Sequence, residues 1–108
     1  MINNFQIKGL EKLVNSSLIR DVYPMVNHIN LLYVDQGYYK DRIIFNIYLN
    51  DESITEENMY QKNFDPHYLI DHYVRNYSKY VGIDLSDVKL DLNVRSPKGK
   101  IIHSFNNE

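Results

Sequence analysis

Apolar side chains recur along the first twenty residues at steps of three and four, which is the spacing of one face of an α-helix. This pattern predicts a helix from about Asn4 to Arg20. Pro24 then disfavours helical backbone at Tyr23, so the helix should end near Arg20. The stripe expected to face the core consists of Ile7, Leu10, Leu13, Val14 and Leu18.

Two segments with the period-two pattern of β-strands follow this helix. Residues 42–50 alternate, and this pattern predicts that Ile43, Phe45, Ile47 and Leu49 face the core. Residues 28–35 have apolar side chains on both faces, so this strand is expected to be central or covered on both sides. Residues 36–40 join the two strands.

The best helix start in the chain lies at Asp65 and Pro66. Asp65 can accept backbone N–H groups as an N-cap, and Pro66 at the first helical position lacks a donor that would be unpaired anyway. The helix is predicted to end at Gly82, which can adopt the left-handed conformation. Before it, the acidic residues 51–58 contain pairs that can start a short helical turn. The predicted buried stripe is Leu69, Ile70, Tyr73, Val74, Tyr77 and Val81.

A hairpin is predicted at the end of the chain. Residues 88–95 alternate between apolar and polar, residues 96–99 form a turn, and residues 100–105 return. The order of elements is therefore α-β-β-α-β-β. A two-layer α+β fold, with a four-stranded, mainly antiparallel sheet and two helices on one face, is the simplest arrangement that buries every stripe. The length of 108 residues suits a single domain, 1–108.

Composition and charge exclude several classes of function. The chain has no cysteine, which rules out disulfides and thiolate chemistry. Its net charge of −2 gives no overall attraction for a phosphate backbone. No apolar run approaches the roughly 18 residues of a membrane span, and the first residues do not resemble a signal peptide, so a cytoplasmic location is expected. The chain also lacks alanine, as AT-rich coding would produce, and a phage protein in the host cytoplasm or virion fits that composition.

The densest polar group lies at the start of the second helix, where His67 and Asp71 share a face at a spacing of four. His67 and His72 are five apart, whereas a two-histidine zinc site on a helix needs a spacing of four. We therefore expect an ion-pairing surface, with Asp71 pairing with Arg75, and neither metal nor cofactor. The alternative is a small enzyme or ligand-binding domain in which His67, Asp71 and His72 are acid–base groups.

A second alternative is a nucleic-acid-binding module on the sheet face opposite the helices. Aromatic and basic groups on one open sheet are typical of readers of single-stranded RNA. Asp91 belongs to the same face and the chain is acidic overall, so this alternative ranks below the others. The residues assigned to this face are Arg42, Tyr48, Lys89, Asn93, Arg95 and His103.

Tyrosine is the residue in excess, with ten in the chain. It combines a large apolar ring with a hydroxyl that tolerates water, and it is enriched in protein interfaces, although AT-rich coding accounts for the excess equally well. Two candidate interfaces are Tyr48 with the Tyr38–Tyr39 turn, and Tyr68 with His72. Unprotected sheet edges offer a second means of association, with another protein or with further copies of this chain. The sequence thus favours a non-catalytic protein-binding or assembly subunit, such as a phage structural or accessory protein.

Overall fold

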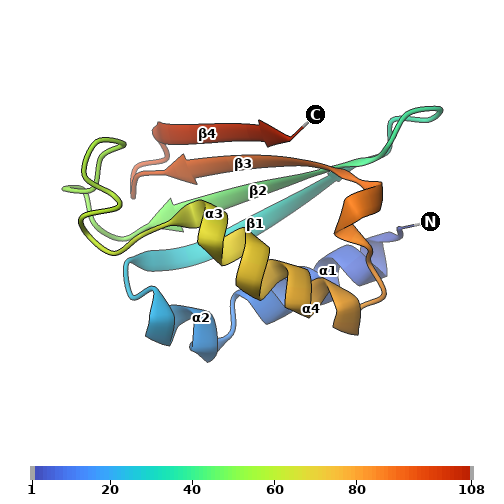
Figure 1. Ribbon diagram of the computed structural model, residues 1–108, viewed down its shortest axis with the longest axis horizontal. Coiled ribbons are helices and arrows are strands. Elements are labelled where there is room, and N and C mark those ends of the chain that lie inside the picture. The colour runs from blue at the N-terminus through green and yellow to red at the C-terminus, as the bar shows by residue number, and fades with distance from the viewer. Residues whose placement is uncertain (1, 108) are drawn as a thin grey trace.

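The computed structural model describes residues 2–107 of the chain (Figure 1). Helical segments lie below one face of a four-stranded sheet, so the protein has two layers. The elements in chain order are α1 (Asn4–Val14), α2 (Ser17–Val22), β1 (Val26–Val34), β2 (Arg42–Leu49), α3 (Pro66–Tyr68), a π-helical segment (Leu69–Val74), α4 (Arg75–Tyr80), a 3₁₀ turn (Leu85–Asp87), β3 (Lys89–Arg95) and β4 (Ile101–Asn107).

The strands lie in the order β1-β2-β3-β4. β1 pairs antiparallel with β2, and β3 pairs antiparallel with β4, whereas the central strands β2 and β3 are parallel. Parallel neighbours need a crossover connection, and here the chain passes from β2 to β3 over one face of the sheet by way of α3 and α4. The α+β class and the predicted order of elements are confirmed, and the sheet is mixed at its centre.

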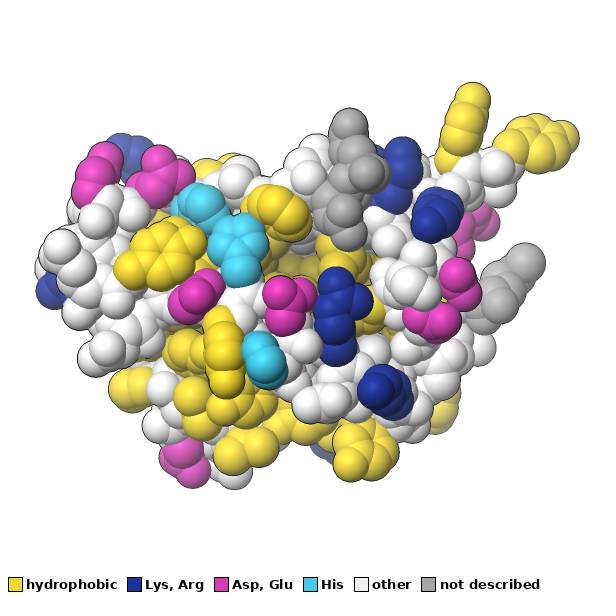
Figure 2. All heavy atoms as spheres, viewed as in Figure 1, with side chains coloured by type: hydrophobic (Ala, Val, Ile, Leu, Met, Phe, Trp, Pro, Cys, Tyr) yellow, Lys and Arg dark blue, Asp and Glu magenta, His cyan; other side chains and the backbone are white. Residues whose placement is uncertain are grey.

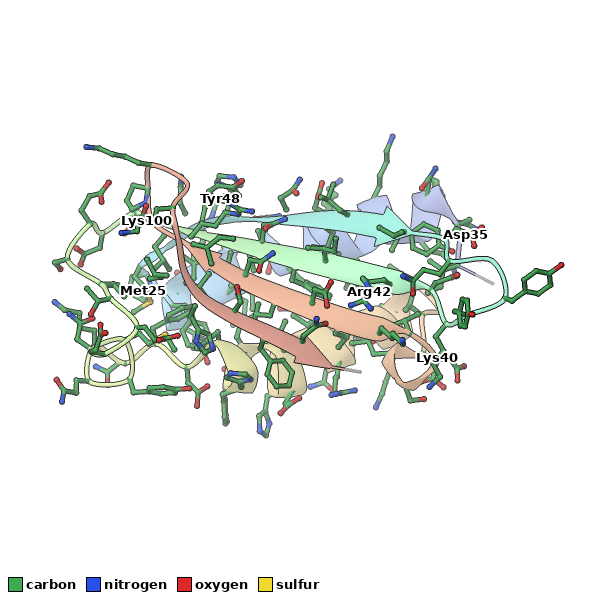
Figure 3. All side chains as sticks on the ribbon, turned by 90° about the horizontal axis from the view of Figure 1, so that it is seen from above. Met25, Asp35, Lys40, Arg42, Tyr48 and Lys100 are labelled. Atoms are coloured by element: carbon green, nitrogen blue, oxygen red, sulfur yellow. The ribbon has the colours of Figure 1, made fainter. Side chains whose placement is uncertain are left out.

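The alternating patterns place the hydrophobic core between the sheet and the helices. Ile43, Phe45, Ile47 and Leu49 of β2 are all fully buried, as their alternation predicts. The apolar residues of β3 are buried beside them, since Phe45 pairs with Leu92 in the parallel register. Among residues 2–107, no second layer covers the opposite face of the sheet, and Figure 3 views the molecule from that side.

The predicted helix over residues 4–20 is interrupted, which corrects the first element. α1 ends at Val14 and α2 begins at Ser17. The backbone becomes extended at Ser16, with φ −70° and ψ 164°, and the side chain of the preceding Asn15 bonds to β1, with Nδ2 donating to Ile29 O at 2.8 Å. The break changes the helical phase, so that Ile19 is buried and Leu18, which the pattern placed in the core, is 50% exposed.

The second predicted helix begins where the sequence indicated. Asp65 Oδ1 accepts hydrogen bonds from the backbone N–H groups of His67 and Tyr68, at 3.0 and 3.1 Å. Gly82 follows the last turn with φ +76°, the left-handed conformation that glycine favours. Residues 66–80 are helical throughout, but their middle part is a π-helix rather than an α-helix. The acidic residues 51–58 form turns, including one in which Thr55 N donates to Asn58 Oδ1 at 2.7 Å.

Candidate functional site

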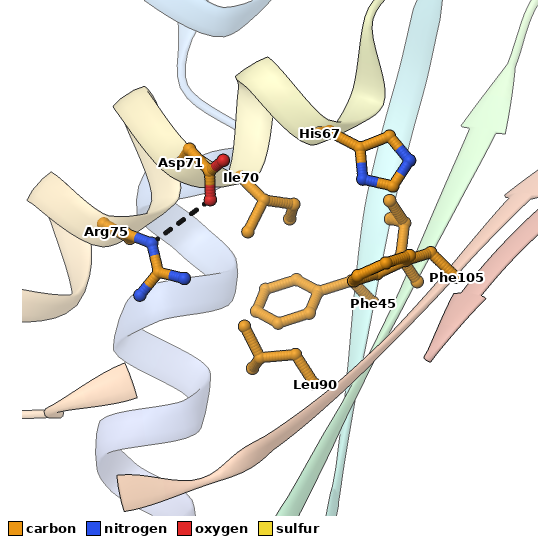
Figure 4. A pocket seen from close by; sticks show the side chains of 8 residues that line it. Phe45, His67, Ile70, Asp71, Arg75, Leu90 and Phe105 are labelled. Atoms are coloured by element: carbon orange, nitrogen blue, oxygen red, sulfur yellow. Dashed lines mark hydrogen bonds and ion pairs between the residues drawn. The ribbon is translucent and has the colours of Figure 1, made fainter. Parts of the chain in front are cut away.

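A small cavity lies between the helical residues 66–80 and the sheet (Figure 4). Its volume is about 190 Å³, and its floor is made mainly of apolar side chains from β2, β3 and β4. The π-helical segment forms part of its wall, and such wide turns often occur at functional sites. The cavity is therefore the best candidate pocket. Its lining residues are Phe45, His67, Ile70, Asp71, Arg75, Leu90, Leu92 and Phe105.

His67 borders this cavity and faces a second histidine from β4. Its Nε2 lies 3.2 Å from Nε2 of His103, and Nδ1 of His103 lies 2.9 Å from Oε2 of Glu56. The rings of Phe105 and His67 also form a T-shaped pair, with centroids 4.7 Å apart and an interplanar angle of 85°. Three segments far apart in the sequence thus build one histidine cluster, and Figure 2 shows histidine side chains gathered near acidic groups on this face.

His103 lies on the opposite side of the sheet from the one the sequence suggested. The register of β3 and β4 pairs His103 with Val94, whose side chain is buried beneath the helices. Paired residues share a face of the sheet, so His103 faces the helix layer and not the open face. The sequence prediction was wrong because the alternation of residues 100–105 does not itself specify which face is covered.

The hydrogen bonds of the cluster fix the positions of its protons when both imidazoles are neutral. The carboxylate of Glu56 is an acceptor, so Nδ1 of His103 donates to it. Nε2 of His103 then has a free lone pair and accepts the N–H of His67 Nε2. The result is a chain from carboxylate to imidazole to imidazole that ends beside the cavity.

The three polar residues expected at the helix start do not converge. Asp71 and His67 both border the cavity, and Asp71 pairs with Arg75 at 3.3 Å, which confirms the expected i, i+4 ion pair. His72 turns away and stacks on Tyr68, with ring centroids 3.9 Å apart. Within residues 2–107, no group of three or more His, Asp or Glu side chains is arranged to hold a metal ion.

The tyrosines proposed as interfaces occupy separate places. Tyr38 and Tyr39 lie at the tip of the β1–β2 loop, where Tyr38 is fully exposed and Tyr39 is 75% exposed. Tyr48 lies near the end of β2 that is remote from this loop (Figure 3). His28 stacks on Tyr48 there, with ring centroids 4.5 Å apart. Tyr48 and the Tyr38–Tyr39 turn thus lie towards opposite ends of β2, and their role as an interface stays a prediction.

Two basic residues of the open sheet face, Arg42 and Arg95, already have partners. Arg42 pairs with Asp91 and also donates to Asn106 Oδ1 at 2.9 Å. Arg95 donates to Asn46 Oδ1 and to Gly99 O, both at 2.9 Å. The charge of Arg42 is thus compensated by Asp91 within the sheet, which leaves less positive potential for a nucleic-acid backbone.

The two edges of the sheet differ. On the outer side of β1, Asn15 accepts from Ile29 N at 2.7 Å, and Glu11 accepts from Leu31 N at 2.8 Å. Asn15 and Glu11 therefore occupy backbone groups in the middle of this edge, so the expectation of unprotected sheet edges was wrong for this part of β1. On the outer side of β4, within the described residues, no hydrogen bond reaches the backbone from outside the β3–β4 ladder.

Two phenols have raised pKa values, and neither belongs to the cavity. The hydrogen bond that Tyr33 donates to Asp41 raises the pKa of Tyr33 to about 12. Burial, with a smaller contribution from Tyr73, raises the pKa of Tyr23 to about 12. Both shifts favour the neutral phenol, so neither tyrosine becomes a stronger base or nucleophile at neutral pH.

No protein-family model, curated protein or solved structure matches this chain. Among the described residues, no helix is both long enough and apolar enough to cross a membrane. The function therefore has to be inferred from the geometry of the site and of the sheet edges.

Proposed function

We propose that this chain is a non-catalytic assembly subunit that associates with further copies of itself by strand pairing along β4. The observation that supports this most directly is the difference between the two sheet edges. On the β1 edge, Asn15 and Glu11 bind backbone groups of Ile29 and Leu31, whereas the backbone of β4 has no such cover among the described residues. An exposed row of unpaired N–H and C=O groups is a template for another strand.

The composition of β4 also favours pairing. Its seven residues, Ile101–Asn107, include no charged residue, proline or glycine. Proteins that keep an edge strand single commonly place such residues there, because they oppose the approach of a second strand. Ile101 and Phe105 are 46% and 45% exposed, so pairing would also bury apolar surface. Two copies joined antiparallel about a two-fold axis would make one continuous sheet.

The Tyr38–Tyr39 tip offers the assembly a second, separate contact. Hydrophobic side chains project from the end of the molecule where the β1–β2 loop lies (Figure 2). Aromatic rings held this far from the core contribute little to folding, but they can bury large areas against a partner. The tip therefore supports a role in protein contacts.

A catalytic role has less support. The acid–base groups that would serve an enzyme are divided between the cavity, with His67 and Asp71, and the outer helix surface, with His72. General acid–base catalysis needs these groups within hydrogen-bond reach of one substrate position. A nucleic-acid role is weakened in turn by the engaged side chains of Arg42 and Arg95.

Light scattering coupled to size exclusion tests the proposal with a matched pair of variants. Ile101→Lys adds a charge on the β4 edge, and the control Leu32→Lys adds a charge on β1. The two positions have similar exposure, since Ile101 is 46% exposed and Leu32 is 49% exposed. We expect the wild type and Leu32→Lys to elute at a multiple of the 12.9 kDa chain mass at high micromolar concentration, and Ile101→Lys to shift towards the monomer.

A wild-type protein that stays at 12.9 kDa throughout this range would contradict the proposal. Equal association of both lysine variants would also contradict it, because the contact would then lie elsewhere. Circular dichroism of each variant provides the control for folding.

A further inference from the structure

We propose that His67 and His103 form a binding site for one divalent transition-metal ion, with Glu56 as the residue that orients His103. The ion is of the kind that imidazole nitrogen binds well, such as Zn²⁺ or Cu²⁺. The site is independent of the proposed assembly, since it lies between β4 and the helix layer and not on the outer edge of the strand.

The distance between the two imidazoles fits a shared ion. Zinc binds histidine nitrogen at about 2.0–2.1 Å with tetrahedral geometry, which places two such nitrogens about 3.3 Å apart. In the structure, Nε2 of His67 and Nε2 of His103 are 3.2 Å apart. The two ligand atoms are thus already at the required separation.

Glu56 provides the outer contact that histidine ligands of metals usually have. Metal-bound imidazoles commonly donate their other N–H to a carboxylate, which fixes the tautomer and the ring orientation. Nδ1 of His103 lies 2.9 Å from Glu56 Oε2, so its proton is held there and Nε2 is left free to bind the ion. His67 binds through Nε2 once its own proton lies on Nδ1.

The number and the position of the ligands determine the affinity for the ion and the effect of the ion on the stability of the fold. Two protein ligands leave the remaining coordination positions to water, so the affinity is below that of sites with three or four ligands. The side chain of His103 is 17% exposed, which gives the ion access from solvent. A bound ion would connect α3 to β4 across 36 positions of sequence and so stabilise the folded state.

The four histidines of the chain provide a balanced experiment. Tag-free protein is titrated with Zn²⁺ by calorimetry, and its melting temperature is measured with and without the ion. The test variant His67→Gln/His103→Gln removes both proposed ligands. The control His28→Gln/His72→Gln removes the same number of imidazoles from sites stacked on Tyr48 and Tyr68.

We expect the wild type and the control to bind one equivalent of Zn²⁺ with a rise in melting temperature, and the test variant to lose both effects. Glu56→Gln should weaken binding by about 10–100-fold, as outer-contact substitutions do. Cu²⁺ should bind more tightly than Zn²⁺. Equal binding by the test and control variants would overturn the proposal, and so would absence of binding by the wild type, since the two imidazoles would then only share a proton.

Discussion

Two side chains of the first helix determine which edge of the sheet is closed. Asn15 both accepts from Ile29 N and donates to Ile29 O, so it imitates the backbone of a neighbouring strand. Glu11 accepts a hydrogen bond from Leu31 N, two residues after Ile29 in β1. Asn15 is also the C-cap residue of α1. One residue thus both caps the helix and protects the edge.

Asn15→Ala should destabilise the protein by about 1–3 kcal/mol, because the N–H and C=O of Ile29 lose their partners at a partly buried position. Urea unfolding measures this free-energy change. The exposed Asn27, whose side chain makes no hydrogen bond within residues 2–107, is the matched control, and its substitution by alanine should cost less than about 0.5 kcal/mol. Equal losses in the two variants would refute the role assigned to Asn15.

At the scale of elements, the sequence correctly predicted those features that depend on residues close together in the chain, namely the buried faces of strands and the start of a helix. The alternation of β2 and β3 indicated the buried face, and Asp65 with Pro66 indicated the start of the second helix. The interruption of the first helix was not indicated by the apolar spacing, and the bond that Asn15 makes beside it reaches a strand distant in the sequence. The apolar periodicity of residues 66–80 also did not distinguish the π-helical segment from an α-helix.

The candidate site was predictable only in its helical part. The spacing of His67, Asp71 and Arg75 indicated a shared helix face, and the structure confirms the ion pair. The contacts of His103 with His67 and Glu56 span 36 and 47 positions, so they depend on the crossover and on the register of β4. Neither property follows from the pattern of a single strand.

The N-cap of the second helix allows a test at this scale. Asp65→Ala should cost about 1 kcal/mol, because two backbone N–H groups at the first turn lose their acceptor. Asp71→Ala removes an exposed i, i+4 pair on the same helix and should cost no more than about 0.5 kcal/mol. Thermal or urea unfolding distinguishes the two, and a larger loss for Asp71→Ala would contradict the assignment of the cap.

The whole molecule is elongated, about 40 × 26 × 21 Å, with the sheet along its length. Its hydrophobic core lies on one side of the sheet only. Asn15 and Glu11 cover the middle of one edge, and the other edge is formed by β4, which contains no Asp, Glu, Lys or Arg. This asymmetry favours extension of the sheet at β4, and we propose that copies of the chain associate there.

Amide hydrogen exchange measured over a range of protein concentrations tests that claim most directly. The amides of β4 that do not bond to β3 should exchange fast in dilute solution and slow down as concentration rises. The amides of Ile29 and Leu31 should be protected at every concentration, because Asn15 and Glu11 hold them within the monomer. Exchange in β4 that is independent of concentration, while another surface such as the Tyr38–Tyr39 tip becomes protected, would contradict the account.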